Sequence, residues 1–148
     1  MTEDNNVMAE NNTMRILLIR PGKRPEVKVI PHTLEEMQKT VGGYIQATYP
    51  WDDDLIGLIC DEDALAKSEQ LWNRKINDDM AIKGPFFLCG LGEEDFTDFP
   101  EDLIDKYTKL FWKPEIFVRT VRGPVIIPVD REWDSEGEMI AALEQRHR

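Results

Sequence analysis

Histidine and cysteine are scarce in this sequence, with two of each among its 148 residues. These side chains supply many catalytic bases, nucleophiles and metal ligands, so few candidates for catalysis remain. His147 lies next to the C-terminal end, and His32 directly precedes an expected helix, where a solvent-facing turn residue is the expected role. Neither Cys60 nor Cys89 has a base nearby in the sequence. The sequence therefore favours a non-enzyme, with no catalytic residues and no cofactor.

Long apolar runs are also missing. No segment approaches the roughly 18 apolar residues of a membrane-spanning helix, and the N-terminus is too polar and acidic for a secretory signal. These features predict a cytoplasmic protein with no membrane partner. Cys60 and Cys89 each end a short apolar run, which predicts buried free thiols rather than a disulfide.

Basic residues are outnumbered, since 18 Lys and Arg oppose 29 Asp and Glu and give a net charge of −11. Most of such a surface repels phosphates, which disfavours general nucleic-acid binding unless one face is locally basic. A protein partner is therefore expected rather than nucleic acid. The segment that could form a basic face is 15–28, in which five cations oppose only Glu26. These cations are Arg15, Arg20, Lys23, Arg24 and Lys28.

The densest feature is an acidic stretch from Gly90 to Asp105, which holds seven carboxylates and no Lys or Arg. Large apolar side chains, Phe96 and Phe99 among them, are threaded through it. We define the acidic face as five of its residues: Glu93, Glu94, Asp95, Asp98 and Asp102. One interpretation is an ordinary solvated surface. The other is a binding surface that imitates the phosphates of DNA and occupies a basic site on a partner.

Short apolar runs bounded by Pro, Gly or Asp predict strands. Their ranges are 15–20, 27–30, 44–49, 55–60, 86–89, 116–118 and 124–127. A capping box at Thr33 and Glu36 predicts a helix that ends at Gly42-Gly43. Further helices are expected after Pro100 and over 136–148, with a short one at 64–72 that is followed by a loop.

These elements are intermixed without regular βαβ spacing, which predicts a single α+β domain. We expect a small mixed or mainly antiparallel sheet packed against two or three helices. Residues 1–13 are expected to form a disordered acidic leader, 14–130 the α+β domain, and 131–148 a charged C-terminal helix or tail. The expected core includes Ile16, Leu18, Val41, Leu58, Phe87, Tyr107 and Phe111.

Two acidic clusters, 52–54 and 61–63, flank one expected strand and carry the oxygen ligands that Mg²⁺ and Ca²⁺ take. The clusters fit no EF-hand loop, and the strand between them spans about 20 Å, too far for one ion. Solvated caps are therefore expected, with no metal. Gly90-Leu91-Gly92 follows a strand, as phosphate loops do, but the acids after it would repel phosphate. A tight strand-to-loop turn is expected there, in which glycine permits a positive φ.

A second hypothesis is a small-ligand site. Asn73 and Arg74 lie beside Trp72 in a segment of weak periodicity, expected to be a loop. An exposed Arg next to an aromatic ring could bind a carboxylate or a phosphate, although an ion pair with one of the many surface acids is the simpler role. The candidate ligand-binding residues are Arg74, Asn73 and Tyr44, with a nucleotide signal as the ligand.

Several runs are characteristic when they are taken together. They are Pro21-Gly22 with Pro25, Leu34 to Tyr49 followed by Pro50, Asn73-Arg74, Gly84 to Phe96, and Pro114-Glu115. Over about residues 14–117 the chain resembles the DUF3846 family, a domain of unknown function. The resemblance implies a protein of phages, plasmids or other mobile elements in a bacterial cell. It implies no reaction and no catalytic residues.

The sequence thus leads to two functional hypotheses. The first is a non-enzymatic accessory protein of a phage or mobile element, which binds a host or phage macromolecule through its acidic face, with counter-defence as its purpose. The alternative is a protein that binds or sequesters a small ligand.

Overall fold

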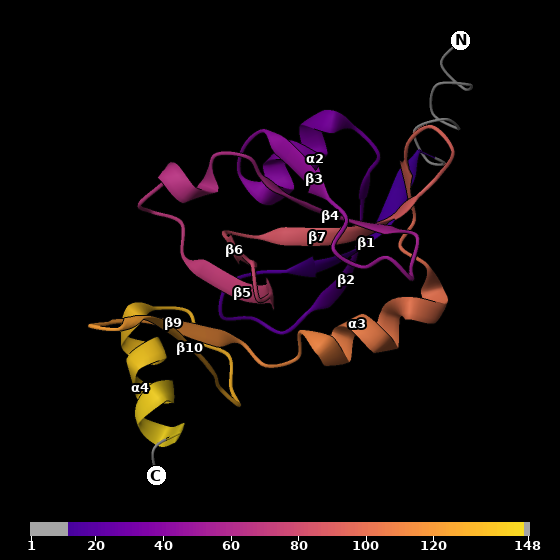
Figure 1. Cartoon of the computed structure of the whole chain (residues 1–148). Coiled ribbons are helices and arrows are strands. Elements are labelled where there is room, and N and C mark those ends of the chain that lie inside the picture. The colour runs from indigo at the N-terminus through magenta and orange to yellow at the C-terminus, as the bar shows by residue number, and fades with distance from the viewer. Residues whose placement is uncertain (1–11, 147–148) are drawn as a thin grey trace.

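The computed structural model describes residues 12–146, and Figure 1 shows how its elements are arranged. The strands are β1 (Thr13–Ile19), β2 (Glu26–Pro31), β3 (Ile45–Thr48), β4 (Ile56–Asp61), β5 (Trp72–Asn77), β6 (Met80–Lys83), β7 (Phe86–Leu91), β8 (Phe96–Thr97), β9 (Glu115–Thr120) and β10 (Gly123–Pro128). The helices are α2 (Leu34–Val41), α3 (Ile104–Leu110) and α4 (Glu136–Arg146), with short 3₁₀ helices η1 (Ala64–Ala66) and η2 (Glu101–Leu103).

One six-stranded sheet forms the centre of the protein. Its strand order is β2-β1-β7-β4-β3, and β8 pairs with β7 beside this path. The other strands form two separate hairpins, β5–β6 and β9–β10. Every strand pair in the described part of the chain is antiparallel. The predicted α+β class with a mainly antiparallel sheet is confirmed.

Both faces of the central sheet are covered, which explains why β1, β4 and β7 are continuous apolar runs. Alternate residues point to opposite faces. On one face Ile16, Leu18 and Phe87 pack with the α2 residues Met37 and Val41. The opposite face of the same strands packs against α3 and the β5–β6 hairpin. Its buried residues include Leu17, Ile19, Leu58, Phe86 and Leu88. All seven residues predicted for the core are buried, and so are both free cysteines.

Local sequence signals define α2. The Thr33 side chain accepts a hydrogen bond from the Glu36 backbone amide at 3.1 Å, as the capping box predicts. Gly42 ends the helix in the left-handed conformation, with φ of 89°, which glycine adopts at little cost. The sequence therefore predicts both ends of this helix correctly.

The prediction for residues 64–72 was wrong. Only Ala64–Ala66 are helical, as η1, and the expected loop after them is the β5–β6 hairpin. The register of this hairpin shifts between Trp72 and Arg74 and again between Lys75 and Asn77. Such bulges interrupt the alternation by which a strand is recognised, because consecutive residues no longer take opposite faces. They also bury two consecutive polar residues, Asn73 and Arg74.

The C-terminal region beyond β10 packs onto the rest of the chain. Val129, Trp133 and Ala142 are buried together with Ile116 of β9. Trp133 also donates its backbone amide to the Gly22 carbonyl in the β1–β2 turn at 2.9 Å. Residues 131–135 are thus part of the folded structure, and α4 begins after them.

The expected leader, residues 1–13, lies outside the described residues except for its end, where Thr13 opens β1. None of the helices in residues 12–146 is long and apolar enough to cross a membrane.

Candidate functional site

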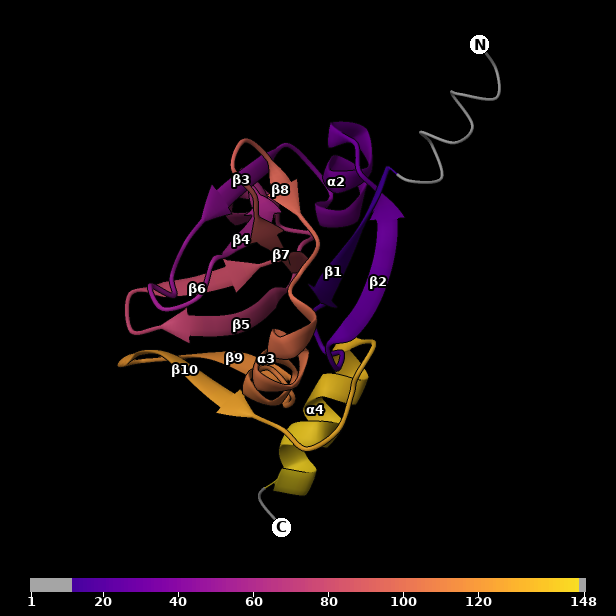
Figure 2. The same cartoon turned by 90° about the vertical axis from the view of Figure 1, so that its right-hand side faces the viewer.

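The acidic face lies on the segment that joins β7 to α3. Glu93, Glu94 and Asp95 occupy the turn before β8, Asp98 follows β8, and Asp102 lies in η2. All five residues are exposed. Figure 2 looks at this side of the molecule, where the segment runs from β8 down to the start of α3. The five residues therefore lie along an extended segment of backbone, which we call the strip.

This strip has a fixed backbone because its centre is bonded to β1. Phe99 is fully buried, and its amide donates to the Arg15 carbonyl at 2.8 Å. The Arg15 guanidinium donates two hydrogen bonds back to the Phe99 carbonyl, at 3.0 and 2.8 Å. The Asp98 carboxylate accepts the Arg15 backbone amide at 2.7 Å. Asp98 thus holds the strip in place as well as contributing charge to it.

Gly90 permits this close approach. Gly90 lies inside β7, and Gly92 opens the tight turn to β8, where its amide donates to the Asp95 carbonyl at 2.8 Å. Neither glycine has a positive φ. Instead, a Cβ atom at Gly90 would lie 2.3 Å from the Asp98 carbonyl oxygen. Only glycine lets the backbone after β8 pass so near β7.

Substitution of Gly90 with Ala should lower the free energy of unfolding by about 1–3 kcal/mol, because the added methyl group forces the backbone at Asp98 away from β7. Urea unfolding measures the loss, and hydrogen exchange at the Phe99 amide should accelerate. Gly137→Ala is the control, since a Cβ atom there would lie 3.9 Å from the Ser135 hydroxyl oxygen, at an ordinary contact distance. Equal stability of Gly90→Ala and the wild type would contradict this role.

Much of the negative charge on the strip is unpaired. Among residues 12–146, Glu93, Glu94 and Asp102 make no side-chain hydrogen bond or ion pair, and neither do their neighbours Glu101 and Asp105. Asp95 differs, because its carboxylate accepts the Phe96 amide and lies 3.3 Å from His32 Nε2. The His32 side chain is only 20% exposed, so the expectation of a solvent-facing residue was wrong.

The basic segment 15–28 is largely occupied by contacts within the chain. Arg24 donates to the carbonyls of Trp112 and Asp130, and its guanidinium lies 4.5 Å from the centre of the Trp112 ring. Lys23 pairs with Asp134, and Arg20 pairs with Glu26 at 3.0 Å. Together with Arg15, which bonds the Phe99 carbonyl, four of the five cations are engaged within the chain. A free basic face is therefore not formed here.

The structure separates the three residues predicted to bind a small ligand. Tyr44 is exposed at the end of the α2–β3 turn, whereas Asn73 and Arg74 are buried in β5. The Asn73 amide donates to the carbonyls of Ile19 and Gly84, both at 2.9 Å. The prediction that Asn73 and Arg74 lie exposed in a loop was wrong, because the bulges of β5 turn both side chains inward.

Arg74 bonds acceptors from three parts of the chain. Its guanidinium donates to the carbonyls of Phe111 and Lys23 and to the side-chain oxygen of Asn73. Burial lowers the pKa of Arg74 to about 10, and the nearby Glu115 carboxylate opposes this shift. The side chain remains charged at neutral pH, and its donors are directed at the protein rather than at solvent.

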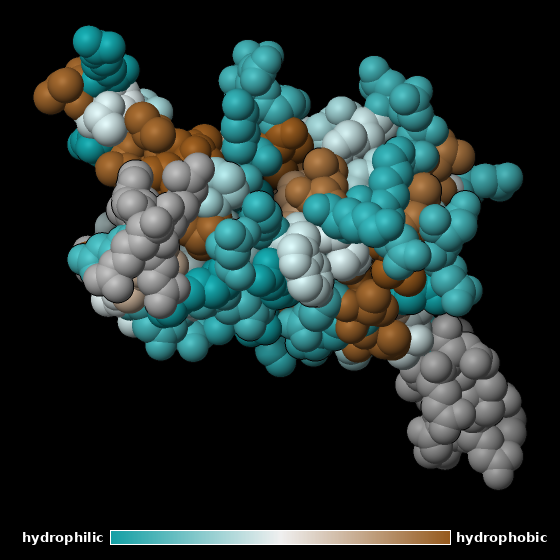
Figure 3. All heavy atoms as spheres, turned by 90° about the horizontal axis from the view of Figure 1, so that it is seen from below, coloured by the Kyte–Doolittle hydropathy of each residue, from teal (hydrophilic) through white to brown (hydrophobic). Residues whose placement is uncertain are grey.

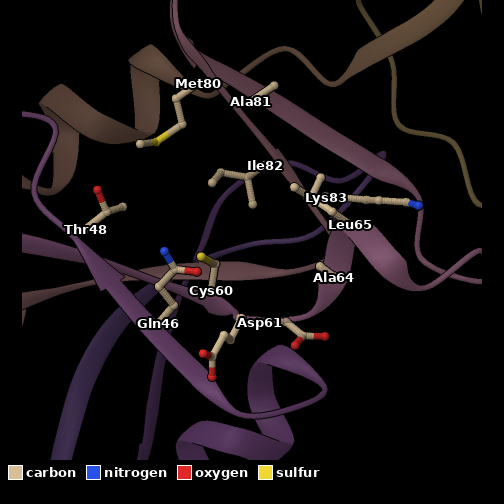
Figure 4. A pocket seen from close by; sticks show the side chains of 11 residues that line it. Gln46, Thr48, Cys60, Asp61, Ala64, Leu65, Met80, Ala81, Ile82 and Lys83 are labelled. Carbon is tan, nitrogen blue, oxygen red and sulfur yellow. The ribbon is translucent and has the colours of Figure 1, made fainter.

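A small pocket lies between β3, β4 and β6 (Figure 4), with a volume of about 180 Å³. Figure 4 shows Cys60 and Gln46 on one side and Met80 and Ile82 on the other. Burial, and to a lesser extent the Asp61 charge, raises the pKa of the Cys60 thiol. Burial also raises the pKa of Cys89 to about 12. Both thiols are therefore protonated at neutral pH and are poor nucleophiles.

Each of the two acidic clusters near β4 contributes one carboxylate to internal contacts. The Asp54 carboxylate accepts hydrogen bonds from Tyr107 at 2.5 Å and Lys106 at 2.8 Å, which lower its pKa and fasten its loop to α3. The Asp61 side chain is buried and bonds Lys67 at 2.6 Å. Among the described residues, no group of three or more His, Cys, Asp or Glu side chains is arranged to hold a metal ion.

A larger groove lies between the two hairpins and was not predicted from the sequence. Its volume is about 400 Å³, and its lining includes Trp72, Ala81, Phe117, Arg119, Pro124 and Ile126. Figures 1 and 2 both show β5–β6 next to β9–β10. Trp72 and Phe117 stack with ring centres 5.3 Å apart and planes inclined by 20°. The apolar runs 116–118 and 124–127 indicated the β9–β10 hairpin, but the bulged β5–β6 hairpin gave no clear signal, and the docking of one hairpin on the other is non-local.

The β9–β10 hairpin also exposes apolar side chains outside this groove. In the view from below, apolar residues gather near the hairpin tip at the left of the molecule (Figure 3). Val121 at the tip is fully exposed, and Val125 of β10 is 45% exposed. Pro124 and Pro128 have no backbone N–H, so two hydrogen-bond donors are missing along the outer edge of β10. This discourages pairing with another strand.

Comparison with known proteins places the main sheet, the acidic face and the β5–β6 hairpin in one family. A family model described as "Domain of unknown function (DUF3846)" matches residues 14–112. The match ends before Pro114-Glu115, so β9, β10 and α4 lie beyond it. No curated protein and no solved structure matches the chain. The chain belongs to the DUF3846 family.

Proposed function

We propose that this protein is a non-enzymatic accessory protein of a phage or other mobile element that binds a basic host or phage macromolecule through its acidic face. Its expected purpose is counter-defence in the bacterial cytoplasm. The mobile-element setting rests on the family resemblance rather than on the geometry of the site.

The observation that carries the proposal is a row of unpaired carboxylates on a fixed backbone. Glu93, Glu94 and Asp102 are exposed and make no side-chain bond within residues 12–146. The buried Phe99 anchor and the bonds between Arg15 and Asp98 hold the strip in one conformation. A prearranged row of charges loses little conformational entropy when it binds, and it accelerates encounter with a basic partner.

Two further features support a protein partner. The net charge is −11, and most cations of segment 15–28 are engaged within the chain, so phosphate backbones are repelled. The raised pKa values of Cys60 and Cys89 argue against thiol chemistry and for a binding role.

The test is charge reversal that spares the residues that hold the strip. Glu93, Glu94, Glu101 and Asp102 are changed to Lys, while Asp95 and Asp98 are kept because they accept backbone hydrogen bonds. Proteins captured from bacterial lysate by the wild type are purified, and their association is measured by surface plasmon resonance. The association rate should fall at least about tenfold, and the wild-type rate should fall steeply with added salt.

The matched control reverses four exposed acids elsewhere, Glu35, Asp52, Glu69 and Asp79, and changes the net charge by the same amount. Both variants should keep the thermal stability of the wild type to within about 1 kcal/mol, because exposed charges contribute little to folding. If both variants lose the same amount of association rate, the loss is caused by the change in net charge and not by the acidic face. Unchanged association in the first variant would remove the acidic face as the binding surface.

A further inference from the structure

The groove between the β5–β6 and β9–β10 hairpins combines aromatic side chains with positive charge in a chain that is otherwise strongly acidic. We propose that this groove is a binding site for a free mononucleotide, whose base packs against the apolar lining and whose phosphate is held by Arg119 and Lys83. The site is separate from the acidic face, and the proposal does not depend on the function proposed for that face.

The apolar part of the groove has the size and character of a small-ligand site. Its volume of about 400 Å³ falls within the range of pockets that hold small molecules. Phe117 and Ile126 are directly opposite each other in the β9–β10 pair, so both side chains are on the hairpin face that lines the groove. Trp72 stacks on Phe117 from the other hairpin and is 38% exposed. Planar apolar surfaces of this kind favour flat aromatic ligands.

The charges at the rim indicate an anionic ligand. Arg119 lines the groove. Lys83 lines the neighbouring small pocket, but its ammonium lies 5.9 Å from the centre of the ring of Trp72, which lines the groove. Lys75 is opposite Ala81 in the β5–β6 pair and therefore on the same face. None of the lining residues is acidic. Asp78 and Asp79 lie in a shallower hollow beyond Ala81, where Asp78 pairs with Lys75 at 3.3 Å.

A mononucleotide satisfies both features, whereas simpler or larger ligands satisfy only one. Inorganic phosphate would leave the aromatic lining unused, and a nucleoside would leave Arg119 and Lys83 unpaired. A polynucleotide would bring many phosphates against a protein of net charge −11, which opposes binding. Arginine suits the phosphate because its planar group can donate two parallel hydrogen bonds.

The groove spans the end of the family match. Trp72, Ala81 and Lys83 belong to the matched residues 14–112, but Phe117, Arg119 and Ile126 lie beyond them. The hairpin that follows the matched domain therefore supplies most of the lining and one of the two proposed phosphate ligands.

The test uses the full chain and isothermal titration with AMP, GMP, CMP and UMP, each at up to roughly 1 mM. At least one nucleotide should bind saturably and shift the NMR signal of the Trp72 indole. Arg119→Glu should weaken that binding about tenfold or more, and Phe117→Ala should do the same. The corresponding nucleoside and inorganic phosphate should each bind more weakly than the nucleotide.

Arg122→Glu is the matched control, because Arg122 lies on the same hairpin at its exposed tip and is absent from the groove lining. It should leave the affinity unchanged. Circular dichroism verifies folding of each variant; if Phe117→Ala is unfolded, the exposed Arg119→Glu decides the question. The acidic-face reversal variant should bind the same nucleotide, which separates the two proposals.

Three results would overturn the proposal. The first is no saturable binding of any of the four nucleotides. The second is binding that Arg119→Glu leaves unchanged. The third is tighter binding of a dT12 oligonucleotide than of any mononucleotide, with a steep salt dependence, which would indicate a single-strand site instead.

Discussion

Replacement of Arg74 with Met should lower the free energy of unfolding by about 2–4 kcal/mol. The change leaves the buried carbonyl of Phe111, the carbonyl of Lys23 and the side-chain oxygen of Asn73 without their donor. Each buried acceptor without a partner costs about 1–3 kcal/mol. Removal of a buried charge offsets part of this loss, because burial already lowers the pKa of Arg74 to about 10. Urea unfolding measures the difference.

Lys75→Met is the control for this experiment. Lys75 is the next residue, and its side chain is 46% exposed, so its loss should change stability by less than about 0.5 kcal/mol. Arg74→Lys should be nearly as damaging as Arg74→Met, because one ammonium group cannot reproduce the fork of donors. A stability loss for Arg74→Met no larger than that for Lys75→Met would show that the buried hydrogen bonds contribute nothing net.

The Asn73–Arg74 pair is best understood as a structural polar core of the matched domain. Asn73 bonds the end of β1 and the turn before β7, and Arg74 bonds the β1–β2 turn and the end of α3. All of these partners lie within residues 14–112. The pair thus joins the β5–β6 hairpin to the sheet, where apolar contacts alone would leave several carbonyls unpaired.

The elements that the sequence predicts well are those whose signals are local. The cap residues of α2 lie within a few positions of the helix they end. The apolar runs of β1, β4 and β7 reflect burial on both faces of the sheet. A strand with one exposed face would instead alternate apolar and polar residues. Phe87 and Tyr107 were likewise correctly assigned to the core from their own segments.

The features that the sequence does not predict depend on distant parts of the chain. The β5–β6 hairpin contains bulges and buried polar residues, so its pattern resembles a loop until the partners of Asn73 and Arg74 are known. The nucleotide groove needs Trp72 next to Phe117, and these residues are brought together only by the docking of two hairpins. Gly90 was interpreted as a turn residue because the approach of Asp98 cannot be inferred from either segment alone.

The acidic face is intermediate between these cases. Its charge is a property of consecutive residues and is evident in the sequence, and the structure leaves all five of its side chains exposed. The bonds that separate Asp95 and Asp98 from the unpaired acids depend on the distant Arg15 and the neighbouring Phe96 amide. Only the structure therefore shows which charges can be reversed without disturbing the backbone.

The largest single loss of stability is expected for Phe87→Ala, at about 3–5 kcal/mol. Phe87 is fully buried in the centre of the sheet, opposite Leu18 of β1 and Ile59 of β4. Its truncation opens a cavity that strands paired on both sides cannot close. Tyr44→Ala is the control, because Tyr44 is 67% exposed and its loss should cost less than about 1 kcal/mol. If the urea midpoint of Phe87→Ala matches that of Tyr44→Ala, Phe87 is not part of a close-packed core.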